Sequence, residues 1–256
     1  MNLSMATDLA INYKSPAQIA RVVSEAWGGT NLYCPNCDTS CLSATPVNTA
    51  VYDYLCLVCR QHFQLKCMSA PIGRRIMDAA YNTMMRAINE DRVPNLFALH
   101  YERSSWTVKN LLLIPHFALS SSAIQARTAL SSVARRAGWI GCFIVLENIP
   151  GDARIHLVKD GVVVPSAQVR DCYARIRPLE KVPVKERGWM LDVLRVVQAL
   201  GKREFTNGEV YRFAPELEKL HPENRHVRDK IRQQLQFLRD RGLLTQVERG
   251  VWRVEG

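Results

Sequence analysis

The chain has 256 residues, a formal net charge of +10 and a hydrophobic content of 47%. This length fits one large domain or two unequal ones, and the hydrophobic content excludes a disordered basic tail. The positive charge favours an anionic partner, most often nucleic acid, although solubility alone is an alternative explanation. The longest apolar runs are far shorter than the ~20 residues that span a bilayer, and we see no signal-peptide pattern. We therefore expect a cytoplasmic protein with no membrane partner.

Helical and extended patterns are mixed over residues 1–180, which predicts an α/β or α+β domain. A helix is predicted over residues 13–27, beginning near Pro16 and ending at Gly28-Gly29. A second helix is predicted over residues 74–89, because apolar residues recur there on one helical face. Strands are predicted at residues 96–101, 110–114, 139–146 and 154–158, with a turn at Asp160-Gly161.

The C-terminal part has a different pattern. Residues 177–187 are polar and contain two prolines, so we interpret them as a linker. Thr206 and Glu209 form a predicted capping box at the start of a helix. Helices are predicted over residues 189–200, 207–220 and 225–241, followed by a β-hairpin over residues 243–254. Three helices and a hairpin in this order are typical of a winged helix-turn-helix, so we expect a second domain over residues 181–256.

Four of the eight cysteines form two C-x-x-C pairs, separated by 18 residues, at Cys34, Cys37, Cys56 and Cys59. Two such pairs can present four thiolates in the tetrahedron that Zn²⁺ accepts, and the spacing is typical of zinc sites. Unrelated buried pairs or a redox motif are the weaker alternatives. Four thiolates leave no position open for water, so we expect a structural zinc ion. The remaining cysteines are interpreted as small buried residues: Cys41, Cys67, Cys142 and Cys172.

A possible catalytic pattern follows the first C-x-x-C pair. Gln64 and Lys66 alternate along a predicted strand, so they share one face, as does His62. Alternation of this kind is also found in any half-buried strand. Asp53 lies in a segment that could pair with this strand as a hairpin, with the second pair of cysteines at the turn. An acid on one strand and polar-x-Lys on the next is the pattern of the PD-(D/E)xK nucleases.

The chemistry of such a site depends on oxygen ligands. Mg²⁺ could be held by the Asp53 carboxylate, the Gln64 side-chain oxygen and the Leu65 carbonyl. The metal would polarise a phosphate and generate a hydroxide, and Lys66 would orient the attacking water or stabilise the transition-state charge.

Several separated stretches carry a resemblance to one family. They are residues 33–37, Asp53 with the second cysteine pair, Leu65-Lys66, and residues 80–85, 134–142, 230–236 and 238–240. Over nearly its whole length the sequence resembles the DpnI-type restriction endonucleases, which cut GATC when its adenine is methylated. The resemblance implies an α/β PD-(D/E)xK nuclease domain with a mixed sheet and an inserted four-cysteine zinc ribbon, followed by a winged helix. It also implies double-stranded DNA methylated on adenine as the partner and a monomer, and it implies no particular protein partner.

The family's metal site falls on Asp53 and residue 64, and its catalytic lysine on Lys66. Gln64 departs from the usual acid and removes one negative charge, which predicts weaker Mg²⁺ binding.

Two segments could read the methylated base. Arg135, Arg136 and Trp139 match the family's reading loop, in which the arginines hold phosphates or guanine edges and the indole packs on the methyl group. A buried core tryptophan beside surface arginines is the alternative. In the winged helix, a recognition helix is predicted with buried Val227, Ile231, Leu235 and Leu238. Its candidate DNA-contacting residues are Arg225, His226, Arg228, Arg232 and Gln233, although a solvated basic face is also possible.

Two other functions stay open at this point. A zinc-ribbon and winged-helix protein could bind or read DNA without cutting it. A nuclease of this type could also act on unmodified or differently methylated DNA.

Overall fold

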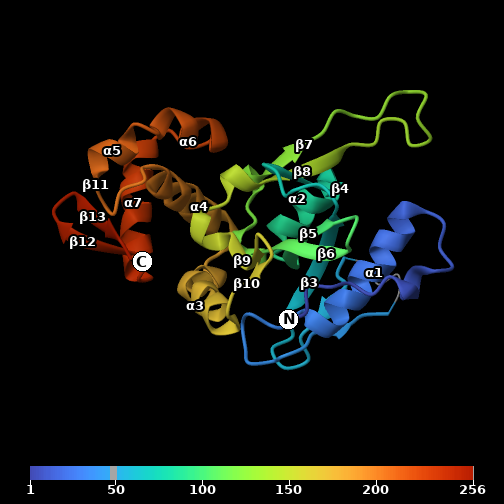
Figure 1. The fold of residues 1–256 in the computed structure, drawn as a ribbon. Helices are drawn as coiled ribbons and strands as arrows, with labels where there is room; N and C mark the ends of the chain where they lie inside the picture. Colours follow the sequence, from blue (N-terminus) through green and yellow to red (C-terminus); the bar gives the residue numbers. More distant parts are fainter. Residues whose placement is uncertain (47–50, 256) are drawn as a thin grey trace. The chain divides into compact units, whose positions relative to one another are not determined.

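The computed structural model describes residues 1–46 and 51–255, and they fold into two compact units. Unit 1 comprises residues 1–76, 92–116 and 153–174, and unit 2 comprises residues 77–91, 117–152 and 175–255. Both units mix helices and strands, as the sequence predicts (Figure 1). No helix formed by the described residues is long and apolar enough to cross a membrane.

Unit 1 is built on a seven-stranded mixed sheet with the order β1-β2-β3-β5-β6-β9-β10. The β3 and β5 strands are parallel, and every other neighbouring pair for which a register is given is antiparallel. The strands are β1 (Ser43–Ala44), β2 (Tyr54–Leu55), β3 (His62–Met68), β5 (Asn95–Glu102), β6 (Thr107–Ile114), β9 (Ile155–Lys159) and β10 (Val162–Val163). This topology confirms the predicted α/β class with a central mixed sheet.

The core of unit 1 lies around the central strands. Residues 96–99 of β5 and 111–114 of β6 are buried on both faces, which explains their continuous apolar sequence. The helix α1 (Pro16–Asn31) packs against β3, and α3 (Ser166–Ile176) adds buried Val169 and Tyr173. The 3₁₀ helix η1 (Asp8–Ala10) packs on α1. The predicted strands at 96–101, 110–114 and 154–158 are confirmed, as is the turn at Asp160-Gly161, where both residues have positive φ.

The α1 helix continues through Gly28-Gly29, so the predicted end at these glycines is wrong. A Cβ on Gly28 would lie 2.3 Å from the Tyr54 hydroxyl oxygen. That hydroxyl donates a hydrogen bond to the Glu25 carbonyl at 2.7 Å. Gly28 therefore allows α1 to pack closely against the sheet. In the sequence alone, a glycine with this role looks the same as a glycine that ends a helix.

Unit 2 contains a three-stranded sheet with the order β4-β8-β7, formed by β4 (Arg75–Ala80), β7 (Ile124–Ala126) and β8 (Gly141–Val145). The predicted helix over 74–89 is half wrong, because its first part is β4 and only α2 (Tyr81–Asn89) is helical. Along β4, Ile76 and Asp78 are buried while Met77 is exposed, which is the alternation of a strand. Pairing with β8, a long-range contact, decides the conformation here against a helical pattern. The short 3₁₀ helices that follow are η2 (His116–Ala118), η3 (Ser121–Ala123), η4 (Leu146–Asn148) and η5 (Gly151–Ala153).

The C-terminal part of unit 2 is a winged helix, as predicted. Its elements are η6 (Arg177–Lys181), α4 (Val184–Ala199), β11 (Glu204–Thr206), α5 (Asn207–Tyr211), α6 (Ala214–Leu220), α7 (Val227–Asp240), β12 (Leu244–Glu248) and β13 (Val251–Val254). The strand order β11-β13-β12 places the hairpin beside a third strand that the sequence pattern does not predict. The capping box of Thr206 and Glu209 is confirmed, since each side chain bonds the other residue's backbone N–H.

Two details of this region differ from expectation. The predicted linker 177–187 is ordered as η6 and the start of α4, and Arg187 is buried and paired with Asp91. The predicted helix 207–220 is two helices, because α5 ends at Tyr211 and α6 begins at Ala214.

Candidate functional site

The four predicted zinc ligands lie together in unit 1. The sulfur atoms of Cys34, Cys37, Cys56 and Cys59 all lie within 4.8 Å of one another. The Cys34–Cys59 and Cys37–Cys56 sulfur pairs are 3.5 and 3.6 Å apart. Tetrahedral zinc with bonds of about 2.3 Å to sulfur separates its ligands by about 3.8 Å, so the cluster fits the ion.

The surroundings of the cluster act in opposite directions on two of its thiols. Burial raises the pKa of the Cys34 thiol, so this residue resists ionisation by itself. Burial also acts on Cys56, but hydrogen bonds outweigh it and lower the pKa of that thiol to about 6. The Arg170 guanidinium on α3 donates to the carbonyls of Cys34, Cys37 and Thr39 at 3.1–3.5 Å. These hydrogen bonds attach the segment with the first cysteine pair to α3.

The other four cysteines are mostly not buried, which corrects the expectation for them. Cys142 alone among them is buried, and its thiol donates to the Ala79 carbonyl. Cys41 is exposed, and Cys67 and Cys172 are half-buried. Cys67 lies on β3 and Cys172 on α3, at positions that are only partly covered. Residue type alone does not tell such positions from fully buried ones.

The second cysteine pair forms the turn of a hairpin, as predicted. Strands β2 and β3 are antiparallel, with Tyr54 opposite Phe63 and Leu55 opposite His62. Between them, the Cys56 N–H donates to the Gln61 carbonyl, and the Arg60 N–H donates to the Cys56 carbonyl. Zinc on Cys56 and Cys59 would therefore fix the turn that joins the two strands.

The hairpin brings Asp53 against the Gln64-Leu65-Lys66 segment. The Asp53 N–H donates to the Phe63 carbonyl at 2.8 Å, and the Leu65 N–H donates to Asp53 Oδ2 at 2.7 Å. The positive charge of Lys66 acts on the same carboxylate. Gln64 and Lys66 lie on alternate positions of β3, and both are half-buried. The Asp53 carboxylate is thus held against the backbone segment that carries Gln64 and Lys66.

Burial dominates the electrostatics of this site. It raises the pKa of the Asp53 carboxyl, against the opposing effects of the Leu65 N–H bond and the charges of Lys66 and Arg21. An unliganded carboxylate is therefore held here at a cost, which a bound cation would remove.

Sequence reasoning did not select Glu25 and Arg21, one turn apart on α1. Burial raises the pKa of Glu25, and the charge of Asp53 raises it further. Arg21 lies 3.9 Å from Glu25 and acts on both carboxyl groups. A second carboxylate is therefore within electrostatic range of Asp53, although residue 64 is not an acid. No local pattern could reveal this, because α1 precedes β2 by more than twenty residues.

His62 and Tyr52 flank the same hairpin. Their rings stack with centroids 4.1 Å apart, and His62 is exposed at the start of β3. This contact gives His62 a packing partner beside the candidate site.

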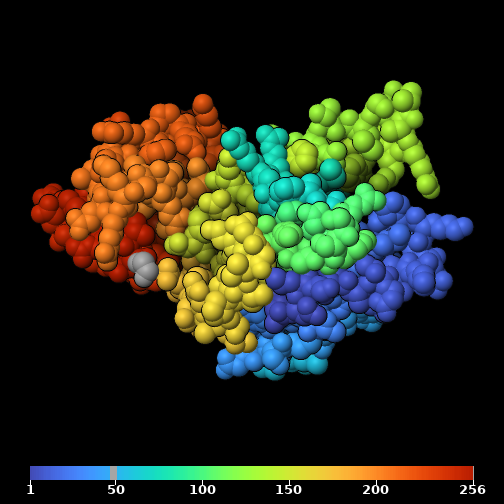
Figure 2. Space-filling model, viewed as in Figure 1, coloured from blue at the N-terminus to red at the C-terminus, as the bar shows by residue number. Residues whose placement is uncertain are grey.

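The predicted reading loop lies in unit 2, within a long segment between β7 and β8 that we call the arm (residues 127–140). Figure 1 shows the arm extending from the two strands, and Figure 2 shows it projecting beyond them. Arg135 and Arg136 are exposed, and Trp139 is only half-buried, so it is not a core tryptophan. The Arg136 guanidinium lies 5.0 Å from the centre of the Trp139 ring. Two arginines and an indole are therefore presented together.

The second predicted DNA-contacting element is α7. Its inner face is buried at Val227, Ile231, Leu235 and Leu238, which confirms the predicted stripe. The five candidate contacts are exposed: Arg225, His226, Arg228, Arg232 and Gln233. Three of them have local partners. Arg232 pairs with Asp229 at 2.5 Å, and Gln233 accepts from Lys230 at 2.8 Å. The Arg228 guanidinium lies 5.8 Å from the centre of the Tyr211 ring. The polar face of α7 is thus open at its N-terminal end.

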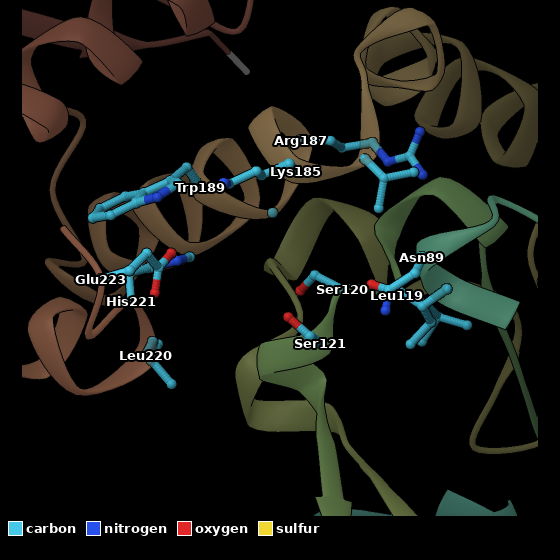
Figure 3. A pocket seen from close by; sticks show the side chains of 13 residues that line it. Asn89, Leu119, Ser120, Ser121, Lys185, Arg187, Trp189, Leu220, His221 and Glu223 are labelled. Atoms are coloured by element: carbon cyan, nitrogen blue, oxygen red, sulfur yellow. The ribbon is translucent and has the colours of Figure 1, made fainter. Parts of the chain in front are cut away.

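A pocket of about 340 Å³ occurs elsewhere in unit 2, between the end of α2, residues 119–121 and the start of α4 (Figure 3). Beside it, the fully buried Asp192 accepts from Ser122 at 2.6 Å and pairs with His221 at 2.8 Å. The His221 ring stacks on Trp189, with centroids 3.8 Å apart. A buried carboxylate needs such partners, and this one connects η3, α4 and the segment after α6. The pocket is a structural junction and contains none of the predicted catalytic residues.

Comparison with protein families agrees with these features. The model of the DpnI family, described as the Dam-replacing family, matches residues 1–182. The model of its C-terminal domain, the Dam-replacing HTH domain, matches residues 185–254. The chain therefore belongs to the DpnI (Dam-replacing) family. Membership implies a restriction endonuclease of the methylation-dependent kind, and the winged helix implies DNA binding.

Proposed function

We propose that this protein is a type II restriction endonuclease that cleaves double-stranded DNA at GATC when the adenine is methylated, by Mg²⁺-dependent phosphodiester hydrolysis. The observation that carries the proposal is the hydrogen bond between Asp53 Oδ2 and the Leu65 N–H, beside the charge of Lys66. Residues 1–180 would form the nuclease domain and residues 181–256 the winged-helix reader. The protein would act as a monomer.

The Mg²⁺ ion would be held by the Asp53 carboxylate, the Gln64 amide oxygen and the Leu65 carbonyl. These are oxygen donors, which Mg²⁺ prefers, and when bound it would neutralise charge on the phosphate. Lys66 would orient the attacking water or stabilise the negative charge that develops on phosphorus oxygens. Water would form the new bond to phosphorus as the bond to the leaving oxygen breaks.

Recognition would be shared by two elements. Trp139 would pack on the methyl group, with Arg135 and Arg136 on phosphates or guanine edges. In the winged helix, residues near the start of α7 would contact base edges, as in other recognition helices. Those residues are Arg225, His226, Arg228, Arg232 and Gln233. One methyl group in an apolar contact is worth only about 1–3 kcal/mol, so two readers in one chain would multiply a modest discrimination.

One observation favours a second candidate function. Gln64 supplies no negative charge, so Mg²⁺ binding is weaker than with an acid at this position. If the loss were complete, the protein would read methylated DNA without cutting it. The charge of Glu25 near Asp53 argues for retained catalysis.

A paired plasmid digest tests the proposal. One plasmid comes from a host that methylates adenine in GATC and the other from a host that does not, with and without Mg²⁺. We expect cleavage of the methylated plasmid only, with Mg²⁺ only, and none by Lys66→Ala. Cleavage of the unmethylated plasmid would point to another nuclease substrate. Tighter binding of methylated DNA without any cleavage would establish the reader instead.

A further inference from the structure

Trp139 owes its position to the absence of a side chain at Gly141. A Cβ built on Gly141 would lie 2.7 and 2.8 Å from two carbons of the Trp139 six-membered ring. Real Cβ atoms do not approach other atoms that closely, so the indole lies directly against the Gly141 backbone. The backbone of Gly141 does not have the positive φ that would require glycine. Contact with the ring is therefore the physical reason for glycine at this position.

Arg127 is a second neighbour of Gly141. Its Cδ would lie 3.3 Å from the same Cβ, and its guanidinium lies 5.2 Å from the centre of the Phe143 ring. The Arg127 N–H donates to the Gly141 carbonyl at 2.9 Å, which closes the base of the arm. The aliphatic part of Arg127 and the Gly141 backbone thus lie next to each other.

The rest of the arm holds Trp139 through its backbone and through the exposed side chain of Arg136, whose guanidinium lies 5.0 Å from the centre of the ring. The Leu130 N–H donates to the Trp139 carbonyl at 2.9 Å, and the Gly138 N–H donates to the Leu130 carbonyl at 3.0 Å. Gly138 has a φ of +74°, and the tip beyond it is exposed, with Val133 92% accessible. Backbone bonds fix where the chain runs but leave the indole free to rotate. Among the neighbours of the ring, the backbone of Gly141 is the rigid one, so contact with it selects the orientation of the indole.

We infer that Gly141, with Arg127 beside it, is a positioning residue for methyl-group recognition: it holds the Trp139 ring in the orientation that packs on the methylated base. The inference rests on the proposed function, because it gives Trp139 its reading role. A side chain at residue 141 would push the ring away and reduce the preference for methylated DNA, while the phosphate contacts of the arm's arginines would persist.

The test is a double-mutant cycle on binding. Affinities for a duplex with one GATC, methylated on both strands or on neither, are measured for wild type, Gly141→Ala, Trp139→Ala and the double variant. Binding is measured without divalent metal, so that no DNA is cut. Gly73→Ala is the matched control, since a Cβ there would meet nothing within 4 Å and its φ is not positive.

We expect Trp139→Ala to reduce the preference for methylated DNA by about tenfold or more, the value of one methyl contact. Gly141→Ala should lose most of the same preference, whereas Gly73→Ala should keep it. Adding Gly141→Ala to Trp139→Ala should cause no further loss, because the ring it displaces is absent. In the double variant the methyl group added at residue 141 meets no indole ring. A loss of preference in Gly141→Ala that comes from displacement of the ring is thereby distinguished from one that comes from misfolding of the protein.

The outcomes distinguish the two claims. Full preference in Gly141→Ala together with its loss in Trp139→Ala overturns the positioning role and leaves the proposed function intact. An additional loss in the double variant likewise overturns it, because Gly141 would then act without the indole. Full preference in Trp139→Ala overturns the reading role of Trp139 and, with it, the inference.

Discussion

The β2–β3 hairpin and the arm, which we propose to carry catalysis and reading, are held in place by different forces. In the hairpin, strand pairing, the bond from the Leu65 N–H to the Asp53 carboxylate and a cysteine cluster hold Asp53 against β3. In the arm, residues 127–140 leave the sheet, and a ring against a glycine fixes Trp139. Catalysis requires atoms placed to a fraction of an ångström, whereas packing on a methyl group requires a surface of the right orientation. The difference indicates that changes to each region should have separate effects.

The largest effect on the hairpin should come from removal of a cysteine of the cluster. Cys56→Ser removes one thiolate of the predicted zinc site and loosens the turn that holds Asp53 near Leu65. We expect the bound zinc to fall from about one ion per chain to almost none, with loss of cleavage and a large drop in thermal stability. Zinc released to a chromogenic chelator and thermal unfolding measure the two effects.

Cys41→Ser is the control, since Cys41 is exposed and outside the cluster. Equal zinc content in both variants would contradict the predicted site.

The metal dependence of the hairpin should change when its missing acid is restored. Gln64→Glu adds a carboxylate next to Asp53, so we expect the Mg²⁺ concentration for half-maximal cleavage to fall on the order of tenfold. Gln168→Glu, on the exposed side of α3, adds the same charge away from the site and should change nothing. A titration of cleavage rate with Mg²⁺ distinguishes them. An unchanged midpoint in Gln64→Glu would show that residue 64 does not face the metal.

A smaller effect concerns stability and pH. Because burial raises the pKa of Asp53 in the folded state, its protonated form contributes stability below the unfolded pKa of about 3.9. That contribution is lost as the pH rises through the folded pKa. Asp53→Asn should therefore be more stable than wild type at neutral pH without Mg²⁺, and the difference should vanish near pH 4.

Thermal unfolding across this pH range measures the effect, with the exposed Asp171→Asn as the control. If Asp53→Asn were less stable than wild type at neutral pH, the ionised Asp53 carboxylate would not reduce the free energy of unfolding, and this prediction would be wrong.

The two regions also differ in how far the sequence predicts them. The hairpin is local: Asp53 and Gln64 are close in the chain, the intervening cysteine pair marks the turn, and strand alternation aligns Gln64 with Lys66. The winged helix can also be predicted from the sequence, because its capping box and the apolar stripe of α7 are short-range patterns.

What the sequence could not reveal depends on distant partners. Glu25 reaches Asp53 only because α1 packs on β3, and Gly28 is required by the Tyr54 hydroxyl. The β4 strand forms where a helix was predicted, because β8 supplies its partner. The reason for Gly141 appears only when the Trp139 ring is seen against it.

One measurement tests most directly whether cutting and reading belong to separate regions. Cleavage with Mg²⁺, and binding to methylated and unmethylated GATC duplexes without it, are measured for Asp53→Asn and Trp139→Ala. The account predicts that Asp53→Asn loses cleavage by at least about a hundredfold but keeps its preference for methylated DNA. It predicts that Trp139→Ala keeps Mg²⁺-dependent cleavage at high enzyme concentration but loses most of that preference. Loss of methyl preference in Asp53→Asn, or undiminished cleavage by it, would contradict the account.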